Sequence, residues 1–138
     1  MTKRREGNEP ADRRAALGRA AEAYAERWLR DRGWTFLERR FRRSFGEIDL
    51  VFRHDETLVF VEVRSRTDWT RGRPAETIGR TKRRTLVRVA LAWLRAHGAL
   101  DRVCRFDVVE MRPEGDSWRL RHWPDAFRPE VSERGRRY

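Results

Sequence analysis

Alternating apolar and polar residues predict a β-hairpin near the middle of the chain. Residues 46–53 and 57–66 follow the two-residue period of strands, and the polar segment 54–56 interrupts them as a turn. The first strand has apolar residues at every second position, which are Ile48, Leu50 and Phe52. Because successive side chains of a strand point to opposite faces, these three are expected to share one face.

Helical spacing of apolar residues predicts one helix before this hairpin and one after it. The first runs from residue 11 or 12 to residue 32 and ends at Gly33. Its expected buried stripe consists of Leu17, Ala21, Tyr24 and Trp28. The second runs from residue 81 to residue 97, and Gly98 suits the left-handed turn after a helix. Its expected buried stripe consists of Leu86, Val89, Ala90, Trp93 and Leu94.

Three further strands and one loop complete the pattern. A strand begins at residues 34–37, and two more follow at residues 103–111 and 117–123, with a turn at 113–116. Residues 65–78 contain turn formers and no period, which indicates a flexible loop. Trp69 in this loop has two equal interpretations: a stacking platform or lid residue, or a side chain that folds back onto the sheet.

Length and composition predict a single basic domain. The chain has 138 residues, and we expect the folded domain at 11–127, with residues 1–10 and 128–138 as disordered charged segments. The net charge of +11 favours a polyanionic partner, either nucleic acid or an anionic membrane surface. No apolar run is long enough to span a membrane, and no signal peptide is evident, so a soluble, cytoplasmic protein is expected.

Cysteine and histidine give little chemistry. The single cysteine, Cys104, excludes an internal disulfide and a multi-thiolate zinc site, and its apolar neighbours predict that it is buried. His122 has no other histidine or cysteine at ligand spacing, so it is interpreted as structural or exposed.

Acidic residues of the hairpin are the main candidates for chemistry. Glu62 and Arg64 share one face of the second strand, and Asp49 lies on the strand expected alongside. Two converging carboxylates form the kind of oxygen site that Mg²⁺ accepts together with water and phosphate. The alternative is a simple exposed ion pair between Glu62 and Arg64, worth roughly 0.2–1 kcal/mol, and the residues alone favour it. On the first helix Glu22 lies at the margin of the buried stripe, where a solvated side chain is the default.

Two basic segments are candidate phosphate contacts. Four arginines lie within residues 38–43, including Arg42 and Arg43, next to Phe41 and Phe45, which are interpreted as core residues in preference to base-stacking ones. The second helix begins with a group of cations, which are Arg80, Lys82, Arg83, Arg84 and Arg88. Cations there oppose the helix dipole, and a bound phosphate would compensate for this; a solvated basic face is the equal alternative.

The motifs GEIDL (46–50) and LVFVEV (58–63) resemble those of the YraN-like family in the PD-(D/E)XK nuclease superfamily, small proteins akin to Holliday-junction resolvases. Gly18 followed by Ala21-Glu22, Lys82 and the RFDVV segment (105–109) are similar to the family pattern too. The resemblance covers about residues 15 to 127. It departs at Arg64, where lysine is usual.

This resemblance implies a restriction-endonuclease-like α/β fold, with a mixed sheet of about five strands flanked by helices. It implies a Mg²⁺- or Mn²⁺-dependent endonuclease acting on branched or structured DNA, and by analogy a homodimer. The residues implied to be catalytic are Glu22, Asp49, Glu62 and Arg64, with Asp49 and Glu62 as metal ligands. The implied nucleic-acid contacts are Arg42, Arg43, Lys82, Arg83 and Arg84.

Two other functions remain open. One is a nucleic-acid-binding module that keeps the fold and the carboxylates but cleaves poorly, and the other, weaker, is an adaptor that docks a protein or membrane. Arg64 bears on the first alternative, because a lysine can accept a proton from the attacking water whereas a guanidinium stays charged. An electrostatic role for this position is favoured, since water on a metal needs less help in losing its proton.

Overall fold

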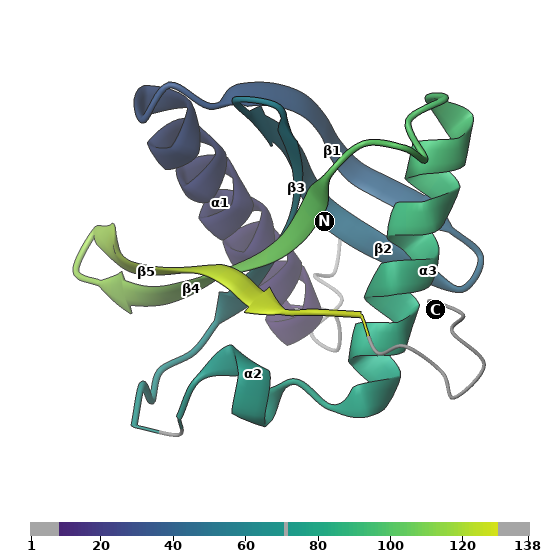
Figure 1. Ribbon diagram of the computed structural model, residues 1–138. Coiled ribbons are helices and arrows are strands. Elements are labelled where there is room, and N and C mark those ends of the chain that lie inside the picture. Colours follow the sequence, from purple (N-terminus) through teal and green to yellow (C-terminus); the bar gives the residue numbers. More distant parts are fainter. Residues whose placement is uncertain (1–8, 71, 130–138) are drawn as a thin grey trace, which may run out of the picture.

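A five-stranded mixed sheet with helices on both faces forms the protein (Figure 1). The computed structural model describes residues 9–70 and 72–129. In chain order the elements are α1 (Glu9–Asp31), β1 (Thr35–Arg43), β2 (Gly46–His54), β3 (Thr57–Ser65), α2 (Pro74–Thr77), α3 (Arg80–Ala96), β4 (Cys104–Glu114) and β5 (Ser117–Phe127). The strands follow one another across the sheet in sequence order, and β3 with β4 is its parallel pair. The predicted α/β, restriction-endonuclease-like fold is thus confirmed.

The core has two layers, one on each side of the sheet. Helix α1 covers one face, where Leu29 packs with Phe52 and Met111. Helix α3 covers the other, where Trp93 packs with Phe60. Figure 1 shows the two helices on opposite sides of the strands. Because both faces of the central strands are covered, side chains in the middle of these strands are buried whichever way they point.

The boundaries of both long helices are close to the prediction, but the buried stripe of α1 differs. Ala21, Ala25 and Leu29 are its buried residues, whereas the Leu17 side chain is 45% exposed. None of residues 10–20 is buried, so the sheet covers this helix only from Ala21 onward. Tyr24 and Trp28, also expected in the stripe, pack against the core only in part.

Strand β2 is irregular near Asp49, and the expectation that Ile48, Leu50 and Phe52 share a face is wrong. Leu50 and Phe52 pack under α1, but Ile48 packs under α3 together with Val51. Residues three apart in a regular strand point to opposite faces, so the alternation breaks between positions 48 and 51. On the neighbouring strand Arg40 has a left-handed φ of 52° and is skipped by the pairing register. The paired irregularity re-aims the side chains around Asp49.

The remaining differences are local. The expected loop at 65–78 contains the short helix α2, and β4 and β5 run further than predicted, to Glu114 and Phe127. Cys104 is only partly buried, because it lies at the start of β4. Across the described residues, no helix is long and apolar enough to cross a membrane. The predicted disordered segments lie mostly outside the described residues.

Candidate metal and phosphate site

The two hairpin carboxylates lie where the regular pairing of β2 and β3 ends. The antiparallel register runs as far as the pair Leu50–Val61. Continued by one step, it would place Asp49 opposite Glu62. The Val63 N–H donates a hydrogen bond of 2.7 Å to Oδ2 of Asp49. The Asp49 side chain therefore takes the place of a backbone partner, and two carboxylates face each other at the point where the strands part.

Burial and charge repulsion favour the protonated form of Asp49. Burial has the largest effect, the Glu62 carboxylate adds to it, and together they raise the pKa of Asp49 to about 8 from an ordinary 3.8, against the opposing Val63 hydrogen bond. Glu22 and Glu47 act in the same direction as Glu62. Asp49 is therefore mostly protonated at neutral pH, and an approaching cation would displace that proton.

Glu62 is partly buried, and only one of its two carboxylate oxygens is paired. Its Oε1 lies 3.4 Å from Lys82 Nζ, whereas Oε2 is buried with no hydrogen-bond partner in the described part of the chain. Burial raises the pKa of Glu62, while Lys82 and Arg64 act in the opposite direction. A buried carboxylate oxygen without a partner costs free energy. The position thus favours a positively charged ligand.

Asp49 and Glu62 fit a divalent cation with hard-ligand preference. Mg²⁺ is commonly bound by one or two carboxylates, with waters and substrate phosphate at the other positions. Within residues 9–70 and 72–129, no group of three or more His, Cys, Asp or Glu side chains is arranged to hold a metal. The two carboxylates, one with an unpaired oxygen, would therefore hold the ion together with non-protein ligands.

Glu22 lies near this pair and is bound to an arginine. Its Oε2 accepts a hydrogen bond of 2.9 Å from Nε of Arg40. Its charge raises the pKa of both Asp49 and Glu62, which shows that it acts on both groups from α1. Glu22 is thus placed to influence the carboxylate pair electrostatically, and its catalytic role stays a prediction.

Close packing of α3 on the start of β2 brings Lys82 to Glu62. A Cβ at Gly46 would collide with the Thr85 side chain and lie 3.1 Å from Cγ2 of Val89. Only glycine therefore lets the helix approach so closely. Lys82 lies three residues before Thr85, on the same side of the helix. The glycine of the GEIDL motif thus helps to set the position of a cation beside the carboxylates.

Arg64 is held in place by the loop that follows β3. Its Nη1 donates to Oγ1 of Thr77 at 3.2 Å, and Nη1 of Arg66 lies 3.4 Å from the same oxygen. Arg66 in turn pairs with buried Glu110 at 3.1 Å. Burial and Arg66 lower the pKa of Arg64, whereas Glu110 and Glu62 favour its charged form. Since a guanidinium remains a cation at any working pH, Arg64 offers charge and hydrogen-bond donors here.

Trp69 folds back onto the sheet, which settles one of the open alternatives. The guanidinium groups of Arg112 and Arg121 lie 4.7 and 4.6 Å from the centroid of its ring. Arg121 also donates to the carbonyl oxygen of Trp69 at 3.4 Å. The loop is therefore fastened to β4 and β5 by stacking and hydrogen bonding.

The predicted nucleic-acid contacts lie in two places, the end of β1 and the start of α3. Arg42 pairs with Glu47 at 3.2 Å, and Arg43 stacks on Phe41 at 4.2 Å. Phe41 is buried, as expected for a core residue. Lys82 contacts Glu62, and Arg83 and Arg84 lie beside it in the first turns of α3. Phosphate contact by these five residues stays a prediction.

Phe45 is not the core residue that the sequence favoured. Its side chain is 38% exposed, and the guanidinium of Arg88 lies 4.2 Å from its ring centroid. It lies in the turn between β1 and β2, at the surface beside Arg88 of α3.

Two residues near the site were not singled out in the sequence. Glu47 raises the pKa of Asp49, and Arg40 binds Glu22. Glu47 could have been found, because it is the second residue of the GEIDL motif. Arg40 could not have been found in this way, because its contact with α1 depends on a left-handed backbone conformation. The residues around it do not predict that conformation.

Comparison with known proteins gives one consistent result. The sequence profile of uncharacterised protein family UPF0102 matches residues 21–111. A UPF0102 protein of Anaeromyxobacter dehalogenans (strain 2CP-C) is 48% identical over 116 residues, which cover 84% of this chain and 87% of the relative. A second, of Hahella chejuensis (strain KCTC 2396), is 45% identical over 111 residues, 80% of this chain and 89% of the relative. The matched residues include the whole of the candidate site from Glu22 to Glu110.

Proposed function

Because this chain belongs to uncharacterised protein family UPF0102 and places two poorly compensated carboxylates beside the ammonium group of Lys82, we propose that it is a metal-dependent endonuclease for branched or structured DNA. Membership of this family confirms the resemblance to YraN-like proteins that the sequence motifs indicated. The observation that carries the proposal is the approach of two partly buried carboxylates, Asp49 and Glu62, with one Glu62 oxygen that has no partner in residues 9–70 and 72–129.

In this proposal the acidic residues bind the metal ion and the basic residues bind the phosphate. Asp49 and Glu62 would hold Mg²⁺ or Mn²⁺, and the bound ion would supply Lewis-acid stabilisation of the phosphoryl oxygens and lower the pKa of water. Lys82, whose ammonium lies 3.4 Å from Glu62, would pair with a phosphate oxygen of the substrate. Glu22 keeps the field around the pair negative and so favours cation binding.

Arg64 serves charge stabilisation in this scheme and does not accept a proton. Its guanidinium is held by Thr77 and lies on the same face of β3 as Glu62, where it can orient water or neutralise a phosphate. Lys82 reaches the same carboxylate from α3. A lysine at position 64 is therefore not required to bring an ammonium group to the site.

The substrate and the assembly are part of the same proposal. The cations at the end of β1 and the start of α3, which are Arg42, Arg43, Lys82, Arg83 and Arg84, provide the contacts to DNA phosphates. A four-way junction presents equivalent strands in pairs, which a two-fold symmetric homodimer would match. Sedimentation equilibrium of the protein with and without junction DNA tests this assembly.

The alternative is a nucleic-acid-binding module that retains the fold without efficient cleavage. The feature in its favour is Arg64, which stands where the family resemblance expects a lysine. Both functions require DNA binding that weakens steeply with salt, so binding alone does not separate them.

A cleavage assay separates the two functions. A synthetic four-way junction and a linear duplex of the same sequence are incubated with the protein in Mg²⁺, in Mn²⁺ and in EDTA. We expect cleavage of the junction only with metal, and none by Glu62→Gln, which should still shift the junction in a gel. Glu47→Gln, a nearby acid outside the pair, is the matched control and should cleave.

Two outcomes contradict the proposal in different ways. Salt-sensitive junction binding without cleavage in either metal would favour the binding module. Absence of salt-sensitive binding would overturn both and leave the adaptor function.

A further inference from the structure

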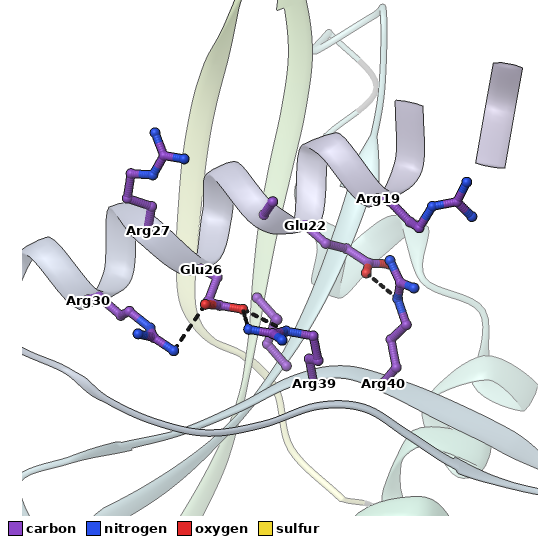
Figure 2. A pocket seen from close by; sticks show the side chains of 9 residues that line it. Arg19, Glu22, Glu26, Arg27, Arg30, Arg39 and Arg40 are labelled. Atoms are coloured by element: carbon purple, nitrogen blue, oxygen red, sulfur yellow. Dashed lines mark hydrogen bonds and ion pairs between the residues drawn. The ribbon is translucent and has the colours of Figure 1, made fainter. Parts of the chain in front are cut away.

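A second basic site lies between α1 and β1, apart from the predicted DNA contacts. It is a pocket of about 320 Å³. Its lining comes from two elements that face each other, together with one residue of β2: Arg19, Glu22, Ala23, Glu26, Arg27, Arg30, Arg39, Arg40 and Leu50. Figure 2 shows Arg39 and Arg40 of β1 reaching toward Glu22 and Glu26 of α1 across this space.

The charges of the pocket do not balance. Five arginines line it against two glutamates. Glu26 is shared, because it pairs with Arg30 at 3.1 Å and with Arg39 at 2.9 Å. Glu22 pairs with Arg40. The structure therefore leaves more guanidinium groups in the pocket than its own carboxylates neutralise.

The guanidinium groups are available to a ligand. The Arg30 and Arg39 side chains are 49% and 58% exposed, whereas that of Glu26 is 14% exposed. Exposed ion pairs contribute little to stability, so an incoming anion can share or replace the single carboxylate that serves both arginines. Arginine is suited to this because its planar fork can bind two oxygens of one phosphate.

The pocket adjoins the carboxylate pair. Glu22, the acidic residue of α1 in the candidate site, lines the pocket. Leu50, the next residue after Asp49, forms part of its wall. Lys82, in contrast, approaches Glu62 from α3, which covers the other face of the sheet. Cations thus flank the candidate cleavage centre from two sides.

We propose that the pocket between α1 and β1 binds a backbone phosphate of the nucleic acid, on the side of the carboxylate pair away from α3. The inference rests on the proposed function and adds a second anchoring point to it. The strand is held by Arg30 and Arg39 on one side and by the start of α3 on the other. The scissile phosphate then lies between them, at Asp49 and Glu62.

The salt dependence of DNA binding tests this site. Binding of a fluorescent four-way junction is measured by anisotropy in EDTA, over a series of salt concentrations, for the wild type and for Arg39→Gln. We expect Arg39→Gln to weaken binding about three- to tenfold at low salt and to reduce the slope of log K against log salt by about 1. A purely structural role for Arg39 would change thermal stability without changing that slope.

Two further variants make the test specific. Arg95→Gln removes an equal charge in the last turn of α3, about 20 Å along the helix from Lys82, and should leave affinity and slope unchanged. Glu26→Gln removes the carboxylate that competes for Arg30 and Arg39, and should tighten binding.

The outcomes distinguish this site from the proposed function. If Arg39→Gln behaves like Arg95→Gln while Lys82→Gln weakens binding, the pocket proposal is overturned and DNA binding at α3 stands. If the wild type shows no salt-dependent binding, the proposed function fails, and the pocket proposal fails with it.

Discussion

Two pairs of carboxylates lie in the same sheet, and the surrounding residues compensate their charge to different degrees. Asp107 and Glu110 on β4 are fully buried and fully supplied with donors. Asp49 and Glu62, at the end of the β2–β3 pairing, are partly buried, and one oxygen of Glu62 has no hydrogen-bond partner among the described residues. Missing compensation, more than burial, therefore distinguishes the candidate site from the pair on β4.

The pair on β4 shows what compensation looks like. Glu110 accepts hydrogen bonds from Arg121 at 2.8 Å, from Trp123 at 2.6 Å and from Arg66 at 3.1 Å. Burial by itself would raise the pKa of Glu110, but the Arg121 and Trp123 hydrogen bonds hold it below the ordinary value. Burial likewise acts upward on the pKa of Asp107, and hydrogen bonds led by that from His122 bring it below the ordinary value.

The largest expected difference between the pairs is in metal binding. Asp49→Asn and Glu62→Gln should each reduce Mn²⁺ affinity by more than about a hundredfold, since each removes an anionic ligand from a two-carboxylate site. Titration calorimetry at pH 8 measures this, with Glu47→Gln as the control that keeps affinity within about tenfold. Undiminished Mn²⁺ affinity in both pair variants would sink the assignment.

The free energy of unfolding should depend more on the pair on β4 than on Asp49 and Glu62. Glu110→Gln should lower the free energy of unfolding by about 3–5 kcal/mol, because Arg66 and Arg121 lose a buried counter-charge. Glu62→Gln should cost less than about 1 kcal/mol, because the charge that it removes is poorly compensated. Urea denaturation of the two variants gives the comparison, and equal losses would erase the distinction between the pairs.

The contribution of Asp49 to stability should change with pH in the opposite direction to that of Asp107. Folded Asp49 keeps its proton up to about pH 8, whereas the unfolded group loses it near 3.8, so this group makes the wild type less stable as pH rises between those values. Asp49→Asn should therefore gain stability relative to the wild type over this range, by about 1 kcal/mol or more at pH 8.

Asp107 serves as a control in which the pH dependence has the opposite direction. Its folded pKa is lowered, so its contribution is present above the unfolded pKa and is lost as pH falls. Asp107→Asn should thus be most destabilised at neutral pH and approach the wild type in acid. Thermal melts from pH 2 to pH 8 test both variants, and parallel curves for Asp49→Asn and the wild type would contradict the raised pKa.

The smallest expected effect concerns Arg64. If its role is electrostatic, Arg64→Lys should change the metal-dependent cleavage rate by less than about tenfold, or roughly 1.4 kcal/mol in barrier. The measurement is single-turnover cleavage of junction DNA in Mg²⁺ and Mn²⁺. A much larger gain in the lysine variant would indicate that the native protein is catalytically impaired and would favour the binding module.

Local patterns in the sequence predicted the hairpin, both long helices and the approach of Asp49 to Glu62. These features depend on short-range periodicity and on a turn of three residues, which a single sequence displays directly. The fold class came from the family motifs within that hairpin. Local patterns were thus sufficient to predict the two hairpin carboxylates and the hairpin that carries them.

The compensated pair on β4 was not predicted, for a physical reason. Asp107 and Glu110 are three residues apart and point to opposite faces of β4, and both faces are covered by apolar side chains of the core. Several of their donors come from β5, among them Arg121 and His122, and the β4–β5 register shifts between Phe106 and Val108. The side-chain positions thus depend on a non-local pairing that periodicity does not encode.

The hydrogen bond from the Val63 amide to Asp49 makes the backbone of β3 a reporter of the ionisation of the Asp49 side chain. The Leu58 and Arg66 amides donate toward β4, whereas the Val63 amide points to the other neighbour and finds a carboxyl oxygen. Its nuclear magnetic resonance shift should therefore follow the titration of Asp49 near pH 8 and respond to an added cation, while amides directed toward β4 stay constant. The Val63 amide signal would thus report the charge state of the site without an added label.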